Sequence, residues 1–261
     1  MKTSLLIFLA CLCTAYTSDA QMLPSDSTAV TALKAQAKHV ATELNVNPFN
    51  GTLSLNNSIN QLKFRYFTTP NLAIRLGFNG NRVNDFSENS TPYGTNPSIY
   101  KNERSSTTLG VNLGIEKHFA GTRRLSPYVG ADLIIENKTS ENEITNGQTV
   151  RTITGGWQTS TFYPANTSYP YNNPSYTVYS YDERGFFRYG INLVSGFDFY
   201  MAKNFFFGYE VNFGFSQKTL QDLEIKTSNS DNSPIENREV KDTSFSFGPS
   251  LMNGVRVGYV F

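Results

Sequence analysis

The C-terminal stretch Phe245-Ser-Phe247-Gly-Pro249-Ser-Leu251-Met-Asn-Gly-Val255-Arg-Val257-Gly-Tyr259-Val-Phe261 places a large apolar residue at nearly every odd position. Successive side chains of a β-strand alternate between the two faces of a sheet, so these residues share one face. Ser246, Gly248, Arg256 and Gly258 lie on the other face. One apolar face and one polar, glycine-rich face are typical of a barrel that crosses an outer membrane, with lipid outside and polar groups inside.

The first twenty residues are predicted to form a secretory signal. Met1-Lys2 supplies positive charge, Leu5 to Cys13 an apolar stretch, and Ser18-Asp19-Ala20 a small-residue cleavage site. The apolar stretch is too short to span a membrane. Both cysteines, Cys11 and Cys13, lie in this segment, so its removal leaves no thiol for a disulfide or a cysteine-ligated metal. A lipoprotein acceptor at Cys11 is the alternative, but this residue lies too early in the apolar stretch.

The composition fits an exported β protein. Charged residues make up 16% of the chain, whereas Phe, Tyr and Gly number 20, 15 and 19. No window beyond the signal reaches the apolar length of a transmembrane helix, so strands must do any spanning. A formal net charge of +1 gives no general reason to expect nucleic-acid binding, which needs clustered Lys and Arg. We predict a signal peptide at residues 1–20, a periplasmic N-terminal segment at 21–39 and one barrel domain at 40–261.

Alternation along the chain predicts eight strands, the smallest even number known for such barrels. Their expected ranges are 40–48, 62–68, 72–84, 106–119, 126–137, 186–201, 205–216 and 245–261. The predicted fold is therefore all-β, an eight-stranded antiparallel transmembrane up-and-down β-barrel.

The predicted connections alternate in length. They are short around Pro70, Gly121 and Lys203, and long at residues 85–104, 139–185 and 222–242. Short turns are typical of the periplasmic rim and long loops of the cell exterior. With an even number of strands, both termini are then expected in the periplasm of a cell with an outer membrane.

A soluble lipocalin-like barrel is an alternative, because it also has eight alternating strands but places its apolar face inside. A water-facing surface should be dense in Lys, Glu and Thr. The polar face predicted here is instead dominated by Gly, Asn and Ser with isolated charges, which is typical of side chains crowded into a narrow lumen. This difference favours the membrane barrel.

Charges of both signs are expected on the inward face of the barrel. The acidic residues are Glu43, Glu116, Asp132, Glu136, Asp198 and Glu210, and the basic residues are Lys63, Arg65, Arg75, Arg188 and Arg256. Charges in a confined lumen persist only when they are paired and hydrogen-bonded. We therefore interpret them as a salt-bridge network that fills the interior, with a gated ion pathway as the alternative.

Catalysis and cofactor binding receive little support from the sequence. Only His39 and His118 are available as histidine bases, and both are expected near the periplasmic end as a tail and a rim residue. No phosphate-binding loop, nucleophile elbow or metal-spaced cluster occurs. We therefore predict no enzyme activity, no metal and no cofactor.

The long segment from Thr139 to Gly185 is the candidate partner-binding loop. Its aromatic residues, interleaved with prolines, are Trp157, Tyr163, Tyr169, Tyr171, Tyr176, Tyr179 and Tyr181. Aromatic side chains with few rotamers make strong contact anchors for a protein or a glycan. The alternative is that the rings pack on one another and on the strand ends.

Four stretches carry a resemblance to a known group of proteins. They are Glu43-Leu-Asn-Val-Asn-Pro-Phe49, Leu62-Lys-Phe-Arg-Tyr-Phe67, Asn71-Leu-Ala-Ile-Arg-Leu-Gly77 and Tyr259-Val-Phe261. The chain resembles the outer-membrane β-barrel proteins of Bacteroidota, in the broad OmpA/OmpX-like eight-stranded group. The resemblance implies contact with outer-membrane lipid, and insertion by an assembly machinery that recognises a last strand with aromatic residues at its end, here Tyr259 and Phe261.

Two classes of function are consistent with these features. The first is a structural or interaction barrel, either free in the outer membrane or an accessory subunit of a larger secretion, transport or assembly complex with other outer-membrane proteins. The second is a small outer-membrane pore. No residue identifies a particular partner.

Overall fold

The computed structural model describes residues 33–46, 59–91, 98–165, 174–228, 236–238, 242–251 and 255–261. The predicted signal peptide lies outside these residues. Nine strands build the barrel wall: β1 (Val40–Val46), β2 (Ile59–Thr69), β3 (Leu72–Thr91), β4 (Ser98–His118), β5 (Leu125–Asn146), β9 (Phe186–Ala202), β10 (Phe205–Leu220), β13 (Thr243–Leu251) and β14 (Val255–Val260). Among the described residues no helix has the length and apolar character needed to cross a membrane.

Antiparallel pairing closes the wall into a ring. The order is β1, β2, β3, β4, β5, β9, β10 and β14, and β14 pairs back onto β1 from Ala41↔Val260 to Val46↔Val255. The predicted eighth strand is divided into two elements, because β13 pairs with the distal part of β10 and β14 with its beginning. The two elements share one neighbour and form one member of the ring, so the eight-stranded barrel is confirmed.

Local side-chain chemistry explains the three tight turns at one end of the barrel, which we name the short-turn end. Asn71 donates its backbone N–H to Thr69 Oγ1 at 3.3 Å, and Leu125 donates to Thr122 Oγ1 at 3.1 Å. Asn204, in the turn between β9 and β10, adopts φ 69°, a left-handed conformation that Asn tolerates better than most residues.

The wall exposes apolar side chains and buries charged ones, which is the reverse of the pattern in a soluble protein. Leu113 and Ile115 on β4 are 54% and 59% exposed, whereas Glu116, the residue after Ile115, is fully buried. Three arginines, Arg65, Arg75 and Arg256, are among the largest fully buried side chains. Charged groups are almost never the filling of a water-soluble core. The apolar face therefore points outward to lipid, and the lipocalin-like alternative is wrong.

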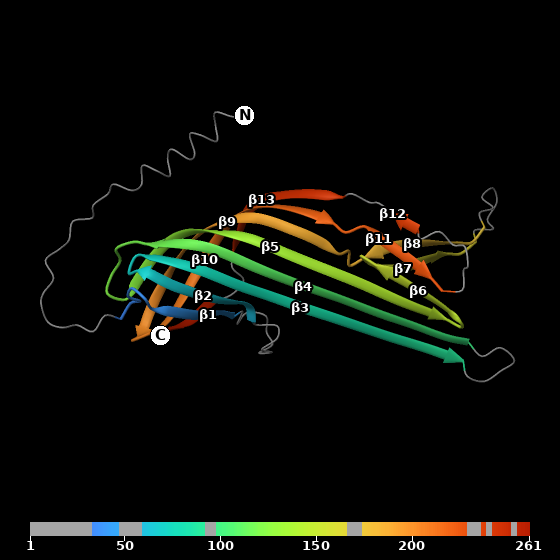
Figure 1. Ribbon diagram of the computed structural model, residues 1–261, viewed down its shortest axis with the longest axis horizontal. Coiled ribbons are helices and arrows are strands. Elements are labelled where there is room, and N and C mark those ends of the chain that lie inside the picture. The colour runs from blue at the N-terminus through green and yellow to red at the C-terminus, as the bar shows by residue number, and fades with distance from the viewer. Residues whose placement is uncertain are drawn as a thin grey trace, which may run out of the picture.

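Two of the three predicted long loops, residues 85–104 and 139–185, are largely strands, and the third, 222–242, contains two short strands, so that part of the prediction was wrong. In Figure 1, β3, β4 and β5 continue well past β1 and β2, and further strands gather at that end. These are β6 (Thr149–Thr154), β7 (Trp157–Tyr163), β8 (Tyr176–Asp182), β11 (Leu223–Thr227) and β12 (Glu236–Arg238). We name this region, with the distal parts of β3, β4 and β5, the extension.

The extension escaped the alternation argument because its strands carry scattered apolar residues but no long continuous apolar face. The β3–β4 ladder runs without a register shift from Leu72↔Lys117 to Thr91↔Ser98, and beyond Gly80 its residues form no apolar stripe. Backbone hydrogen bonds alone continue a ladder that the barrel has already started. A small apolar cluster of Ile153, Leu223 and Ile225, flanked by Ile144 and Tyr181, holds its sheets together.

Candidate functional site

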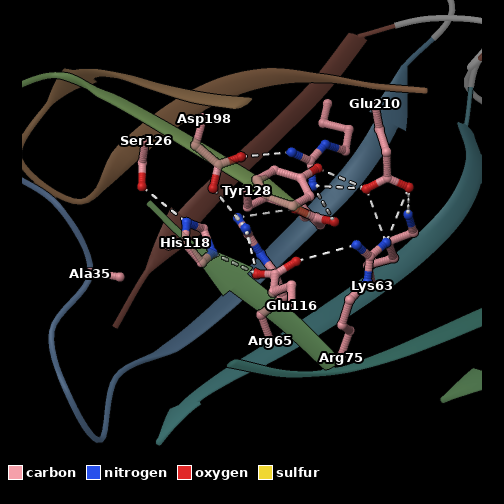
Figure 2. Close-up of polar contacts among 12 residues, drawn as sticks. Ala35, Lys63, Arg65, Arg75, Glu116, His118, Ser126, Tyr128, Asp198 and Glu210 are labelled. Carbon is pink, nitrogen blue, oxygen red and sulfur yellow. Dashed lines mark hydrogen bonds and ion pairs between the residues drawn. The ribbon is translucent and has the colours of Figure 1, made fainter. Parts of the chain in front are cut away.

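Most of the predicted inward charges form a buried network inside the barrel, and Figure 2 shows a large part of it. Each of the eight members of the ring supplies at least one side chain to it. In strand order these are Glu43, Lys63 and Arg65, Arg75, Glu116 and His118, Asp132, Asp198, Glu210, and Arg256. Because the contributors come from every member, the ion pairs tie opposite sides of the wall together across the lumen.

Arg65 and Arg256 form the part of the network nearer the short-turn end. Arg65 contacts three carboxylates, those of Glu43 at 3.2 Å, Glu116 at 3.0 Å and Asp198 at 2.7 Å. Arg256 contacts Glu43 at 3.0 Å and Asp198 at 2.6 Å. The two guanidinium groups therefore share two acids, and removal of either leaves both acids with fewer partners.

Arg75 and Glu210 form the centre of the other part of the network. Arg75 contacts Glu116 at 3.2 Å, Asp132 at 3.0 Å and Glu210 at 3.0 Å. Glu210 also accepts hydrogen bonds from Lys63 Nζ at 3.0 Å and from the Tyr128 hydroxyl at 2.8 Å. Glu116 joins the two parts, because it binds both Arg65 and Arg75.

Inward glycines make room for these large side chains. A Cβ atom placed on Gly196 would lie 2.5 Å from the Tyr128 hydroxyl, and one on Gly258 would lie 2.2 Å from Cζ of Phe206. Real Cβ atoms do not approach other atoms so closely. The glycine-rich polar face seen in the sequence therefore reflects a lumen filled to contact distance.

Glu136 and Arg188 lie apart from the main network. They pair with each other at 2.5 Å, between the neighbouring strands β5 and β9. The Arg188 side chain is 38% exposed, unlike the arginines below it. The single network expected from the sequence is thus a large buried cluster with one separate, partly exposed pair toward the extension.

An aromatic layer and the N-terminal segment lie at the short-turn end of the network. Arg65 stands over the rings of Phe206 at 4.7 Å and Phe67 at 5.6 Å. Below them Ala35 is buried, and its backbone N–H lies 3.4 Å from the Tyr200 hydroxyl. These residues belong to one apolar cluster with Ala41, Ala73 and Val260. Residues 33–39 therefore cover this mouth of the barrel, which sequence patterns gave no reason to expect.

His118 is buried rather than a rim residue, so that prediction was wrong. Its Nδ1 lies 2.9 Å from Ser126 Oγ, and its Nε2 lies 2.9 Å from Glu116 Oε1. His39, as expected, lies in the N-terminal segment, where its Nδ1 accepts the Gln36 N–H at 3.1 Å. The side chains of Ser126, His118 and Glu116 thus form a chain of contacts that the sequence spacing did not reveal.

Although a serine, a histidine and an acid meet here, their arrangement differs from that of a hydrolase triad. In the serine protease triad, Nε2 faces the nucleophile and Nδ1 faces the acid, the reverse of the order at His118. Glu116 is also held by Arg65 and Arg75, so its charge is already neutralised by two guanidinium groups. The arrangement is better explained as part of the buried network. Within the described residues no group of three acidic, histidine or cysteine side chains could hold a metal ion.

The predicted partner-binding aromatics lie mainly on a β-hairpin rather than on an extended loop. β7 and β8 pair from Trp157↔Asp182 to Tyr163↔Tyr176, and the rings of the last pair stack at 5.0 Å. Trp157 donates its indole N–H to the Ser105 carbonyl, and Tyr181 packs on the apolar cluster of the extension. Tyr179 is 56% exposed. Tyr169 and Tyr171 lie outside the described residues.

The residues of the predicted assembly signal lie on the outer surface of the wall. Tyr259 and Phe261 are 43% and 68% exposed, and their rings meet edge to face at 4.9 Å. Phe261 exchanges backbone hydrogen bonds with Val40. The last residue of the chain is therefore paired with the first wall strand, at the seam that closes the barrel.

Comparison with known proteins gives one family match and a similar solved structure. The model of the OmpA-OmpF-like porin family matches residues 45–223. Among solved structures, the crystal structure of the N-terminal β-barrel domain of Pseudomonas aeruginosa OprF is similar over 87% of this chain and 100% of that chain, with 13% sequence identity and a TM-score of 0.32. No curated protein matches the chain.

Proposed function

The chain belongs to the OmpA-OmpF-like porin family, and on that premise we propose that it is a non-enzymatic structural and interaction barrel of the outer membrane. The observation that carries the proposal is the buried network to which every member of the wall contributes. A lumen crossed by such ion pairs has little room for a permanent aqueous path. The outer surfaces of the barrel and the extension are then the parts available for interactions.

The energetics of the network support a closed lumen. Opening a path would separate charges that contact one another at 2.6 to 3.2 Å in a region shielded from bulk water. Breaking a buried ion pair by removing one partner typically costs about 3–5 kcal/mol. Thermal fluctuations therefore break several such contacts at once only rarely. The N-terminal segment adds a second closure at the short-turn end.

We further propose that the short-turn end faces the periplasm and the extension faces the cell exterior. Tight turns on one side and long strands on the other support this orientation, because it is the arrangement found in bacterial outer-membrane barrels. It places Val40 and Phe261, which pair with each other, at the periplasmic side. The exposed Tyr259 and Phe261 are then available to the assembly machinery.

A small pore is the second candidate function, favoured by the porin family to which the chain belongs. Purified mature protein in a planar bilayer distinguishes the two functions. Because the network fills the lumen, we expect no steady conductance of porin size. A variant that lacks residues 21–36 is the control for closure by the N-terminal segment, and the network alone should keep it closed. Steady channels from the unaltered protein would contradict the structural proposal.

An accessory role in a larger complex is proposed from the exposed hairpin of the extension. Phe162 and Tyr179 lie on one face of the hairpin and are 65% and 56% exposed, while Tyr163 and Tyr176 stack on the other face. Exposed aromatic residues on a paired, rigid element are well suited to binding a partner, since little conformational freedom is lost on contact.

The partner proposal is tested by gentle detergent extraction, affinity purification and mass spectrometry of the retained proteins. We expect a stoichiometric outer-membrane partner for the unaltered chain and its loss, by tenfold or more, in the double variant Phe162→Ser with Tyr179→Ser. Phe86→Ser is the matched control, because Phe86 is 58% exposed but lies on β3, away from the hairpin. Equal retention of the partner by the hairpin variant, or a barrel that purifies alone, would contradict the proposed role.

A further inference from the structure

The short-turn end has a basic outer rim. Lys38, Lys117, Arg123, Arg124 and Lys203 are exposed there. Among the described residues at this end, the acidic side chains are buried inside the lumen. None of these five basic residues forms an ion pair within the described part of the chain.

Three of the basic residues belong to two adjacent turns. Arg124 Nη1 donates to the carbonyl of Met201 at 2.9 Å, and the Tyr200 N–H donates to the Arg124 carbonyl at 2.8 Å. These bonds place the turn before β5 against the end of β9, directly before Lys203. We name Arg123, Arg124 and Lys203 the basic cluster.

A groove on the lipid-facing surface begins beside the basic cluster. It has a volume of about 540 Å³, and its lining includes Leu125, Pro127, Ser195, Phe197, Tyr209 and Val211. Leu125 follows Arg124 directly, so the cluster stands at one end of the groove. The groove is largely apolar and lies in the outward face of β5, β9 and β10.

A small residue explains why the wall is hollowed here. Ser195 projects outward from β9 between Val129 on β5 and Val211 on β10. Along its own strand the outward neighbours are larger, with Phe197 on one side. Ser195 pairs with Val129, which lies four residues beyond Leu125 on β5. This separation corresponds to about 13 Å along a strand. An elongated apolar hollow of this length fits a hydrocarbon chain.

We propose that the groove and the basic cluster bind one anionic phospholipid of the inner leaflet. One acyl chain lies in the groove over Ser195, and the phosphate lies at the basic cluster, where guanidinium and ammonium groups donate charge-assisted hydrogen bonds. Charge complementarity selects an anionic headgroup, because no acidic side chain in the described part of the chain forms an ion pair with the cluster. The assignment to the inner leaflet rests on the proposed orientation of the barrel.

Native mass spectrometry of the full mature protein in detergent micelles tests this site. The probes are phosphatidylglycerol and, as the zwitterionic comparison, phosphatidylethanolamine with the same acyl chains. We expect one phosphatidylglycerol to be retained, at least tenfold more strongly than phosphatidylethanolamine. The triple variant Arg123→Gln, Arg124→Gln, Lys203→Gln should lose this preference, and Ser195→Leu, which fills the groove, should weaken retention of both lipids.

Lys38→Gln is the matched control, because Lys38 is an exposed basic residue of the same rim whose backbone N–H bonds to the Phe67 carbonyl on β2, on the side of the ring away from the groove. It should retain phosphatidylglycerol as the unaltered protein does. Folding of each variant is verified by its shift in mobility on unheated gels. Equal retention of the two lipids by the unaltered protein, or an unchanged preference in the triple variant, would overturn the proposal. The micelle measurement does not depend on membrane orientation, which protease accessibility in cells tests separately.

Discussion

Replacement of Arg65 by Ala is expected to lower the free energy of unfolding by about 3–5 kcal/mol, because it leaves buried acids without their partner. Arg65 is fully buried and contacts Glu43, Glu116 and Asp198. It is also the guanidinium that stands over the aromatic layer. The loss is measured as a lower urea midpoint for the unfolding of the barrel in lipid vesicles, with circular dichroism as the signal.

Arg188→Ala is the matched control for the Arg65 variant. Arg188 also pairs with one lumen-side acid, Glu136, but its side chain is 38% exposed. Water can replace the lost partner, so we expect a change below about 1 kcal/mol. Equal losses for the two variants would show that the buried network does not stabilise the barrel more than a hydrated ion pair does.

Leu113→Arg is expected to cost about 2–4 kcal/mol and to reduce the amount of folded protein in the membrane. Leu113 points outward from β4, between Leu76 and Leu133 on the adjacent strands, and is 54% exposed. A charge placed there faces hydrocarbon rather than water. Folded protein is quantified by the fraction that migrates as the compact form on unheated gels after refolding into vesicles.

Phe86→Arg is the control for the lipid-facing substitution. Phe86 is a comparably exposed apolar residue, at 58%, and points to the same side of the sheet as Leu113, but it lies on β3 in the extension. Because the extension is proposed to project into water, this substitution should leave the folded fraction unchanged. A loss at Phe86 as large as that at Leu113 would contradict the placement of the lipid boundary between them.

The faces of the wall strands could be predicted from the sequence because lipid and lumen impose opposite requirements on alternate residues. On β4, for example, the strict alternation of Leu109, Val111, Leu113 and Ile115 with Gly, Asn and Glu is sufficient to orient every side chain. The individual ion pairs could not be predicted. Whether Arg65 meets Asp198 depends on the diameter of the closed ring, and the two residues are 133 positions apart.

The parts that sequence reasoning missed share a lack of apolar periodicity. The extension strands have no long continuous apolar face, so their pattern does not separate strand from loop. The N-terminal cover depends on one small residue, Ala35, which fits against Tyr200. The contact of His118 with Ser126 arises because the two residues face each other across the β4–β5 turn. The length of this turn could have suggested the contact, but it could not have shown that both side chains are buried.

The central claim is that the phenylalanine rings on one face of β10 contact lipid while Phe206, on the other face, lies inside the barrel. Trp157 is the single tryptophan of the chain, so Trp157→Phe provides a background without tryptophan. Into it we would introduce Phe213→Trp, at an outward position that is 38% exposed, or Phe206→Trp, at a fully buried inward position. In vesicles of brominated phospholipid, we predict strong quenching of tryptophan fluorescence at 213 and weak quenching at 206. Equal quenching at both positions, or stronger quenching at 206, would contradict the claim.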